Sequence, residues 1–250
     1  MPEFAIYPSL KGRSVFVSGG GSGIGASIVE HFAAQGSKVA FVDIDEAASK
    51  AVAQKTGALF LKCDIRDVKV YQAAISEAAT RNGAITVLIN NAARDDRHKL
   101  ADVTPEFFDE RIAVNLRHAF FAIQAVVPGM KQAGGGSIVN FSSVSYHTMT
   151  PDLSVYQAAK AAVIGMTRGL ARDLGADRIR LNSITPGWIM TQRQIELWLT
   201  PEAEAQLMKA QVLKEKVYPP DIARMALFLA SDDSAWVTGE RITASGGQRA

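Results

Sequence analysis

A glycine-rich stretch, Gly19-Gly-Gly-Ser-Gly-Ile-Gly25, joins a short apolar run at residues 14–18 to an amphipathic stretch at residues 24–35. The apolar run predicts a buried strand and the amphipathic stretch predicts a helix. Glycines permit a tight turn and a close backbone approach, and the first turn of the helix then directs unpaired N–H groups toward an anion. A strand, a glycine loop and a helix in this order predict a parallel α/β fold with a phosphate site.

Apolar and amphipathic stretches alternate along the rest of the chain. We expect strands at residues 14–18, 38–43, 58–62, 85–90, 136–141, 179–184 and 241–244, and helices at 24–35, 45–54, 68–79, 105–131, 154–174 and 220–230. The strands are continuously apolar, which is typical of a parallel sheet covered on both faces. We therefore predict a single α/β domain over residues 1–250, with a doubly wound Rossmann-type sheet whose ligands bind at the carboxyl ends of the strands.

Composition excludes several classes of protein. Lys and Arg total 27 against 25 Asp and Glu, so the net charge of +2 argues against nucleic acid as a partner. Cys63 is the single cysteine, which excludes an intramolecular disulfide and fits a reducing compartment. The four histidines are scattered, so we expect no metal site. We see no signal peptide and no apolar run near the roughly 20 residues of a membrane helix, and we expect a cytoplasmic protein.

Asp43 ends the second predicted strand, 18 residues beyond Gly25. A carboxylate there can accept hydrogen bonds from both ribose hydroxyls of an adenosine, and it would repel a 2′-phosphate, so we predict NAD rather than NADP. Lys62 and Arg66 are the nearby basic residues that could instead meet a phosphate. Asp64 after the third strand could bind an adenine amino group or cap the next helix, and both interpretations stay open.

Tyr156 and Lys160 are four residues apart in a predicted helix, so their side chains lie on one face. Free tyrosine has a pKa of about 10, and lowering it by about 3 units requires roughly 4 kcal/mol. A nearby ammonium together with a cationic nicotinamide ring could supply that free energy and make Tyr156 a base at neutral pH. The alternative is an accidental pair on a helix surface.

Taken together, these motifs resemble the short-chain dehydrogenase/reductase family along nearly the whole chain. The family's glycine pattern matches Gly19, Gly23, Ile24 and Gly25, and its Asn-Asn-Ala-Gly motif matches residues 90–93, where Ala93 replaces the last glycine. That replacement is acceptable if the φ angle of Ala93 is negative. Its Tyr-x-x-x-Lys motif matches Tyr156 and Lys160, and its catalytic serine, 13 residues before the tyrosine, matches Ser143.

The resemblance implies a role for each matching residue. Tyr156 would be the general base in oxidation, Lys160 would lower its pKa and bind the nicotinamide ribose, and Ser143 would hold the substrate oxygen. Asn115 would connect Lys160 to a chain of water molecules. The residues implied to bind the cofactor are Gly19, Ser22, Gly23, Ile24, Gly25, Asp43, Asp64, Ile65, Asn91, Ala92, Tyr156, Lys160, Pro186, Gly187, Ile189 and Thr191.

Three segments are expected to face the substrate: residues 94–98, residues 145–147, and a lid at about 188–215. Their polar side chains suit a substrate with several hydroxyls better than a steroid or acyl chain. Parts of the chain, such as Asp95–Thr104, resemble NAD-dependent aldose 1-dehydrogenases of the D-xylose, L-arabinose and D-galactose type. That resemblance implies oxidation of a sugar at C1 to a lactone, in a homotetramer. The candidate substrate residues are Asp95, Ser143, His147, Tyr156 and Trp188.

Two alternatives to a sugar dehydrogenase remain. One is an NAD(H)-dependent polyol or carbonyl oxidoreductase acting on another small substrate. The other is a nucleotide-binding protein without activity, which the presence of both Tyr156 and Lys160 argues against.

Overall fold

The computed structural model describes residues 4–248 of the chain. Its centre is a seven-stranded sheet in the order β3-β2-β1-β4-β5-β6-β7, in which every neighbouring pair is parallel. The strands are β1 (Ser14–Ser18), β2 (Lys38–Asp43), β3 (Leu59–Lys62), β4 (Val87–Asn90), β5 (Gly136–Phe141), β6 (Ile179–Pro186) and β7 (Arg241–Ala244). The strands β1, β4 and β5 are buried along their whole length, which explains their uniformly apolar sequences.

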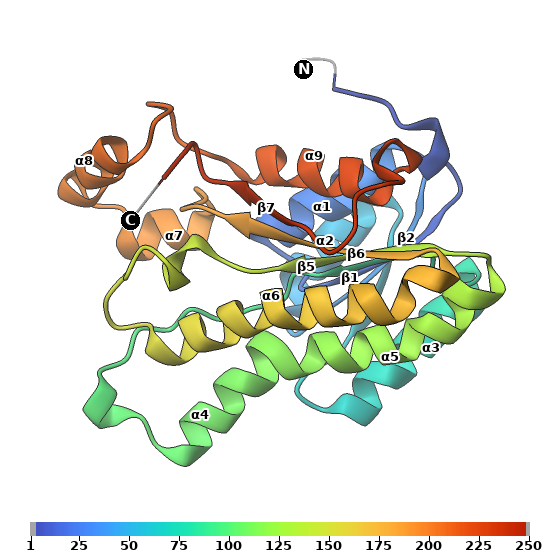
Figure 1. Cartoon of the computed structure of the whole chain (residues 1–250), viewed down its shortest axis with the longest axis horizontal. Coiled ribbons are helices and arrows are strands. Elements are labelled where there is room, and N and C mark those ends of the chain that lie inside the picture. The colour runs from blue at the N-terminus through green and yellow to red at the C-terminus, as the bar shows by residue number, and fades with distance from the viewer. Residues whose placement is uncertain (1–3, 249–250) are drawn as a thin grey trace.

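Helices cover both faces of this sheet (Figure 1). One layer contains α1 (Gly23–Ala34), α2 (Glu46–Thr56) and α9 (Pro219–Ala230), whose apolar residues share a core with β1 and β2. The other layer contains α3 (Val68–Asn82), α5 (His118–Gln132) and α6 (Ser154–Leu174), which pack on the opposite face. The single-domain, doubly wound α/β architecture expected from the sequence is therefore confirmed.

Strand order reverses at β1, which pairs with β2 on one side and with β4 on the other. Ser18 at the end of β1 lies beside Asn90 at the end of β4. The loops that follow these strands separate in opposite directions, which opens a crevice at the carboxyl edge of the sheet. The short helices α7 (Gln192–Trp198) and α8 (Pro201–Ala210) lie toward this edge (Figure 1).

One predicted helix differs in kind from the structure. Residues 105–131 form α4 (Pro105–Ile112) and α5, separated by a π-helical segment, Ala113–Arg117. Asn115 lies in that segment, where its side-chain amide donates to the Arg111 carbonyl oxygen at 3.0 Å. Such π segments are common at functional sites. The other predicted elements agree in type, and residues 154–174 and 136–141 agree at both ends.

Within residues 4–248, no helix is both long enough and apolar enough to cross a membrane. The same described residues contain no group of three or more His, Cys, Asp or Glu side chains placed to hold a metal ion.

Candidate active site

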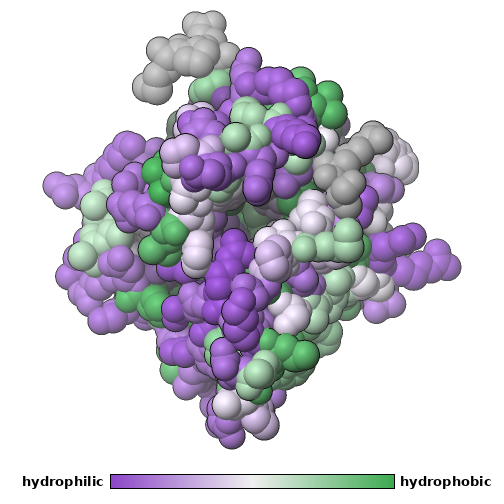
Figure 2. Space-filling model, turned by 90° about the vertical axis from the view of Figure 1, so that its left-hand side faces the viewer, coloured by the Kyte–Doolittle hydropathy of each residue, from purple (hydrophilic) through white to green (hydrophobic). Residues whose placement is uncertain are grey.

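A cavity of about 850 Å³ opens at the carboxyl edge of the sheet. Its walls come from the loops after β1 to β6 and from α7 and α8. Figure 2 shows the molecule from the side on which α7 and α8 lie, where largely hydrophilic side chains surround a central hollow. All sixteen residues implied to bind the cofactor line this cavity, as do Ser143, Asp95 and Trp188.

The glycine loop forms one end of the cavity. Gly19 and Gly23 have φ angles of 70° and 54°, which glycine adopts without strain. A Cβ atom at Gly25 would lie 1.7 Å from the carbonyl oxygen of Gly19, so this position has no room for a side chain. The side-chain amide of Asn91 donates to the carbonyl oxygens of Ser18 and Gly19, at 3.1 and 3.0 Å. The loop is thus held against β4, with its backbone open to a ligand.

Asp43 lies beside this loop, where its carboxylate accepts a hydrogen bond from the Gly21 N–H at 2.9 Å. The two basic residues that could have met a phosphate are engaged elsewhere. Lys62 pairs with Glu46 at 2.8 Å, and Arg66 pairs with Asp64 and with Glu110. No cation forms an ion pair with Asp43 within the part of the chain that the structure describes.

Asp64 does not cap the helix after β3, so the interpretation of Asp64 as a helix cap is wrong. The N-cap of α3 is Asp67, whose side chain accepts from the backbone N–H groups of Lys69 and Val70. Asp64 lines the cavity, and its bond with Arg66 lowers the pKa of its carboxyl. The cap falls three residues later because the chain makes a turn between β3 and α3.

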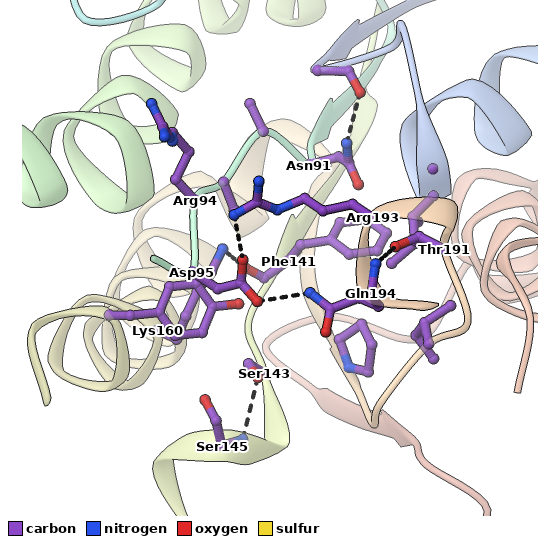
Figure 3. Close-up of a pocket in the computed structure, with 18 of the residues that line it drawn as sticks. Asn91, Arg94, Asp95, Phe141, Ser143, Ser145, Lys160, Thr191, Arg193 and Gln194 are labelled. Atoms are coloured by element: carbon purple, nitrogen blue, oxygen red, sulfur yellow. Dashed lines mark hydrogen bonds and ion pairs between the residues drawn. The ribbon is translucent and has the colours of Figure 1, made fainter. Parts of the chain in front are cut away.

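Tyr156, Lys160 and Ser143 come together at the other end of the cavity. The ammonium of the buried Lys160 lies 5.6 Å from the centre of the Tyr156 ring and donates to the Phe141 carbonyl oxygen at 2.8 Å. Burial lowers the pKa of Lys160 to about 8. Ser143 follows β5, and its hydroxyl accepts from the Ser145 N–H at 3.2 Å (Figure 3).

The pKa of Tyr156 departs from the sequence expectation. Burial raises it, and the carboxylate of Asp95 raises it further, whereas the hydrogen bond with Ser143 and the charge of Arg97 lower it. The expectation that Lys160 lowers this pKa is not met by the protein groups alone. The physical reason is that burial disfavours the charged forms of both residues, the phenolate of Tyr156 and the ammonium of Lys160.

Asn115 is not part of the cavity wall, and among the described residues no direct hydrogen bond joins its side chain to Lys160. Its side chain accepts from the Arg94 N–H at 2.9 Å and donates to the Arg94 carbonyl oxygen at 3.1 Å. The loop after β4 is therefore tied to the π-helical segment. Ala93 in that loop has no positive φ angle, which meets the condition under which alanine can replace glycine there.

His147 is a correction among the candidate substrate residues. Its ring is not part of the cavity wall; it packs edge-on against Tyr146 with the ring centres 4.8 Å apart. Burial and the nearby Arg241 lower the pKa of His147. His147 directly follows the short helix Val144–Tyr146, and spacing along the chain could not show how this helix would place it relative to the cavity.

Sequence reasoning missed three residues that line the cavity at its Tyr156 end: Arg97, Arg193 and Gln194. Arg97 stacks on the ring of Trp198 at 4.9 Å, and Arg193 and Gln194 of α7 contact the loop after β4. The only signal in the sequence was that these residues lie in two polar segments already expected to face the substrate.

Comparisons with known proteins agree with this geometry. A family model described as enoyl-(acyl carrier protein) reductase matches residues 19–249. A D-xylose 1-dehydrogenase from Caulobacter vibrioides is 49% identical over 250 residues, covering 98% of this chain and 99% of that protein. A probable galactose dehydrogenase from Rhizobium meliloti is 49% identical over 247 residues, covering 96% of each chain.

Solved structures show the same fold. A putative short-chain alcohol dehydrogenase from Sinorhizobium meliloti 1021 superposes with a TM-score of 0.89 at 31% identity, covering 96% of this chain and 98% of that one. A short-chain type dehydrogenase/reductase from Mycobacterium ulcerans superposes with a TM-score of 0.91 at 27% identity, covering 96% and 90%.

Proposed function

Because the chain belongs to the short-chain dehydrogenase/reductase family, we propose that it oxidises the anomeric hydroxyl of a cyclic pentose or hexose to the aldonolactone, with NAD as the electron acceptor. The observation that carries the proposal is that one cavity joins the glycine loop to Tyr156, Ser143 and Lys160. Two relatives at 49% identity that carry the names of sugar dehydrogenases support an aldose as the substrate.

The chemistry assigns a part to each side chain. Ser143 holds the C1 oxygen, and Tyr156 accepts the proton of the C1 hydroxyl as the C=O bond of the lactone forms. The hydrogen on C1 leaves as a hydride, for which a bound nicotinamide ring supplies the acceptor. Lys160 adds positive charge beside the phenolate that would form, and its bond to the Phe141 carbonyl oxygen fixes where that charge lies.

The cavity fits a dinucleotide with a free 2′-hydroxyl. Gly19 and Gly25 have no room for a Cβ atom, so the loop packs its own backbone closely there. This tight turn leaves the N–H groups at the start of α1 to face a pyrophosphate. Pro186, Gly187, Ile189 and Thr191 line the part near Tyr156, where they would hold the nicotinamide end. Asp43 forms no ion pair in the described residues, since Lys62 on the neighbouring strand pairs with Glu46. Its carboxylate would accept from the adenosine ribose, and this supports NAD over NADP.

Asp43→Asn is expected to raise kcat/KM with NADP relative to NAD by about 10–100-fold, because it removes a negative charge facing the 2′-phosphate. The amide oxygen can still accept from the Gly21 N–H, so the glycine loop keeps its anchor. Initial rates with both cofactors measure the ratio. Asp45→Asn, at the exposed N-cap of α2, is the matched control. An unchanged ratio in Asp43→Asn would contradict the role of this carboxylate.

Asp95→Asn is expected to shift the acidic limb of the kcat–pH profile for sugar oxidation to lower pH. Asp95 raises the pKa of Tyr156. Removing the charge of Asp95 therefore lowers this pKa, and with it the pH above which Tyr156 acts as a base. The profile is measured at saturating sugar, so that weaker sugar binding does not enter. Asp102→Asn, outside the cavity wall, serves as the control. A limb that stays in place or moves upward would show that Asp95 does not act on this base.

Residues 188–215 are proposed as the substrate lid, since α7 and α8 contribute residues to the cavity wall.

A homotetramer is likewise proposed. An apolar surface groove between α4–α5 and α6 supports one interface; it includes Leu116, Phe120, Phe121, Met166 and Leu170. Trp236, which is 99% exposed, supports a second interface near the C-terminal end of the described residues. A cytoplasmic location stays a prediction.

The function is tested by measuring NADH formation from NAD with pentoses, hexoses, 6-deoxysugars, polyols and simple secondary alcohols. Turnover of one or two aldoses, with lactone as the product, is the expected result. Activity on polyols alone would favour the second candidate, a polyol dehydrogenase, which a D-threitol dehydrogenase from Mycolicibacterium smegmatis at 32% identity supports. Silence on every aldose would overturn the proposed function.

A further inference from the structure

A chain of hydrogen bonds connects the lid to Asp95. The indole N–H of Trp188 donates to the side-chain oxygen of Gln194 at 2.8 Å, and the side-chain nitrogen of Gln194 donates to Asp95 Oδ2 at 2.8 Å. An indole can only donate and a carboxylate can only accept, so each end of the Gln194 amide has one possible partner. Figure 3 shows Gln194 and Arg193 reaching Asp95 from α7.

These hydrogen bonds engage Asp95 Oδ2 and leave its other oxygen, Oδ1, available. No hydrogen bond to Asp95 Oδ1 occurs within residues 4–248; its nearest cation is the guanidinium of Arg193 at 3.5 Å. Arg193 makes its closer contact with Asp96, at 3.0 Å. Asp95 lines the cavity, and its side chain is 21% exposed. The open oxygen is thus a strong acceptor next to the reacting end of the cavity.

The position of the Asp95 carboxylate is unfavourable for catalysis by Tyr156. Its charge raises the pKa of Tyr156, which makes the phenolate harder to form. From the lid, the Gln194 amide orients the carboxylate at 2.8 Å, while the guanidinium of Arg193 lies farther away, at 3.5 Å from Oδ1, and makes its closer contact with Asp96. An oriented, charged acceptor suits a ligand that brings hydroxyl donors of its own.

We propose that Gln194 is a positioning residue, which orients Asp95 so that Oδ1 accepts a hydrogen bond from a sugar hydroxyl other than the one on C1. The proposal rests on the proposed function and deepens it: the substrate class is an aldose selected by that hydroxyl. Gln194 itself does not touch the sugar, and Trp188 acts one step further away by fixing the orientation of the Gln194 amide.

The experiment compares each aldose that the enzyme oxidises with its monodeoxy analogues, using NAD as the cofactor. In the wild-type enzyme, deleting the hydroxyl bound by Asp95 is expected to lower kcat/KM by about 10–100-fold, as for a hydrogen bond to a charged group. Asp95→Ala identifies the hydroxyl, because the loss for that one analogue disappears. Gln194→Met, which keeps the side-chain length, is expected to reduce the loss at the same hydroxyl to about 3-fold or less.

Two further variants separate positioning from general damage to the lid. Trp188→Phe removes the indole N–H together with part of the ring, and it is expected to give a loss between those of the wild-type enzyme and Gln194→Met. Glu196→Gln is the control on the same helix: Glu196 accepts from Gln192 and is not part of the cavity wall, so the deoxy-analogue ratios of this variant are expected to stay at wild-type values. An unchanged KM for NAD and an unchanged Tm in Gln194→Met show that the fold and the cofactor site are intact.

The possible failures are distinguishable. If Gln194→Met slows every sugar by the same factor and leaves the deoxy ratios unchanged, the residue is structural and the inference is overturned while the proposed function stands. The same holds if Gln194→Met and Asp95→Ala affect different hydroxyls. If the wild-type enzyme oxidises no aldose at all, the proposed function falls and the inference falls with it.

Discussion

Tyr156→Phe is expected to lower kcat for sugar oxidation by about 10³-fold or more, while the Kd for NAD changes less than about 3-fold. The phenol oxygen is the one group in the cavity placed by Ser143 and Lys160 to take the proton of the reacting hydroxyl, and general base catalysis contributes up to about 10⁴-fold. The phenyl ring keeps nearly the whole volume of the side chain at the same place in α6, so binding of the cofactor is expected to be preserved. Turnover and NAD titration by fluorescence measure the two quantities.

Tyr146→Phe is the control for this experiment. Tyr146 lies in the short helix Val144–Tyr146 that follows β5. Its hydroxyl contacts Arg241, and the residue is not part of the cavity wall. It is expected to keep wild-type kcat. If Tyr156→Phe retained even a tenth of the wild-type kcat, the base would be another group and the proposed mechanism would be wrong.

Gly25→Ala is expected to weaken NAD binding by at least about 100-fold and to lower Tm. The added Cβ would lie 1.7 Å from the Gly19 carbonyl oxygen and 2.7 Å from the side-chain nitrogen of Asn91. The first contact is with the backbone, so the loop itself must move, and it moves away from the shape that admits a pyrophosphate. Isothermal titration with NAD and a thermal melt measure both effects.

Gly165→Ala provides the comparison. Gly165 lies inside α6, and a Cβ atom there would meet nothing within 4 Å. Alanine is the better helix former by about 1 kcal/mol, so a neutral or slightly raised Tm is expected. Wild-type NAD affinity in Gly25→Ala would show that the glycine loop does not hold the cofactor as proposed.

Much of the fold was predictable because its signals are local. The apolar runs at β1 and β5 predicted buried parallel strands, and the amphipathic pattern of residues 154–174 predicted α6 at both of its ends. The glycine loop was predictable for the same reason, since its shape depends on residues that adjoin in the chain. The Tyr156–Lys160 pair needed only the helical repeat, which places positions i and i+4 on one face.

The sequence could not predict contacts between elements that lie far apart along the chain. Asn115 lies in the π-helical segment that interrupts a predicted helix, and it accepts a hydrogen bond from Arg94, 21 positions away. Asp64 does not cap α3, because the turn after β3 places Asp67 at the N-cap. His147 packs against Tyr146 near Arg241 and is not part of the cavity wall.

The chemistry of the site divides in the same way. By itself the sequence determined which side chains lie at the carboxyl ends of the strands, because an apolar run and the position where it ends are properties of a short segment. Only the tertiary structure decided that burial raises the pKa of Tyr156, and that Gln194 bonds to Asp95 from 99 positions along the chain. Burial and long-range hydrogen bonds arise from packing between elements, and no local pattern encodes them.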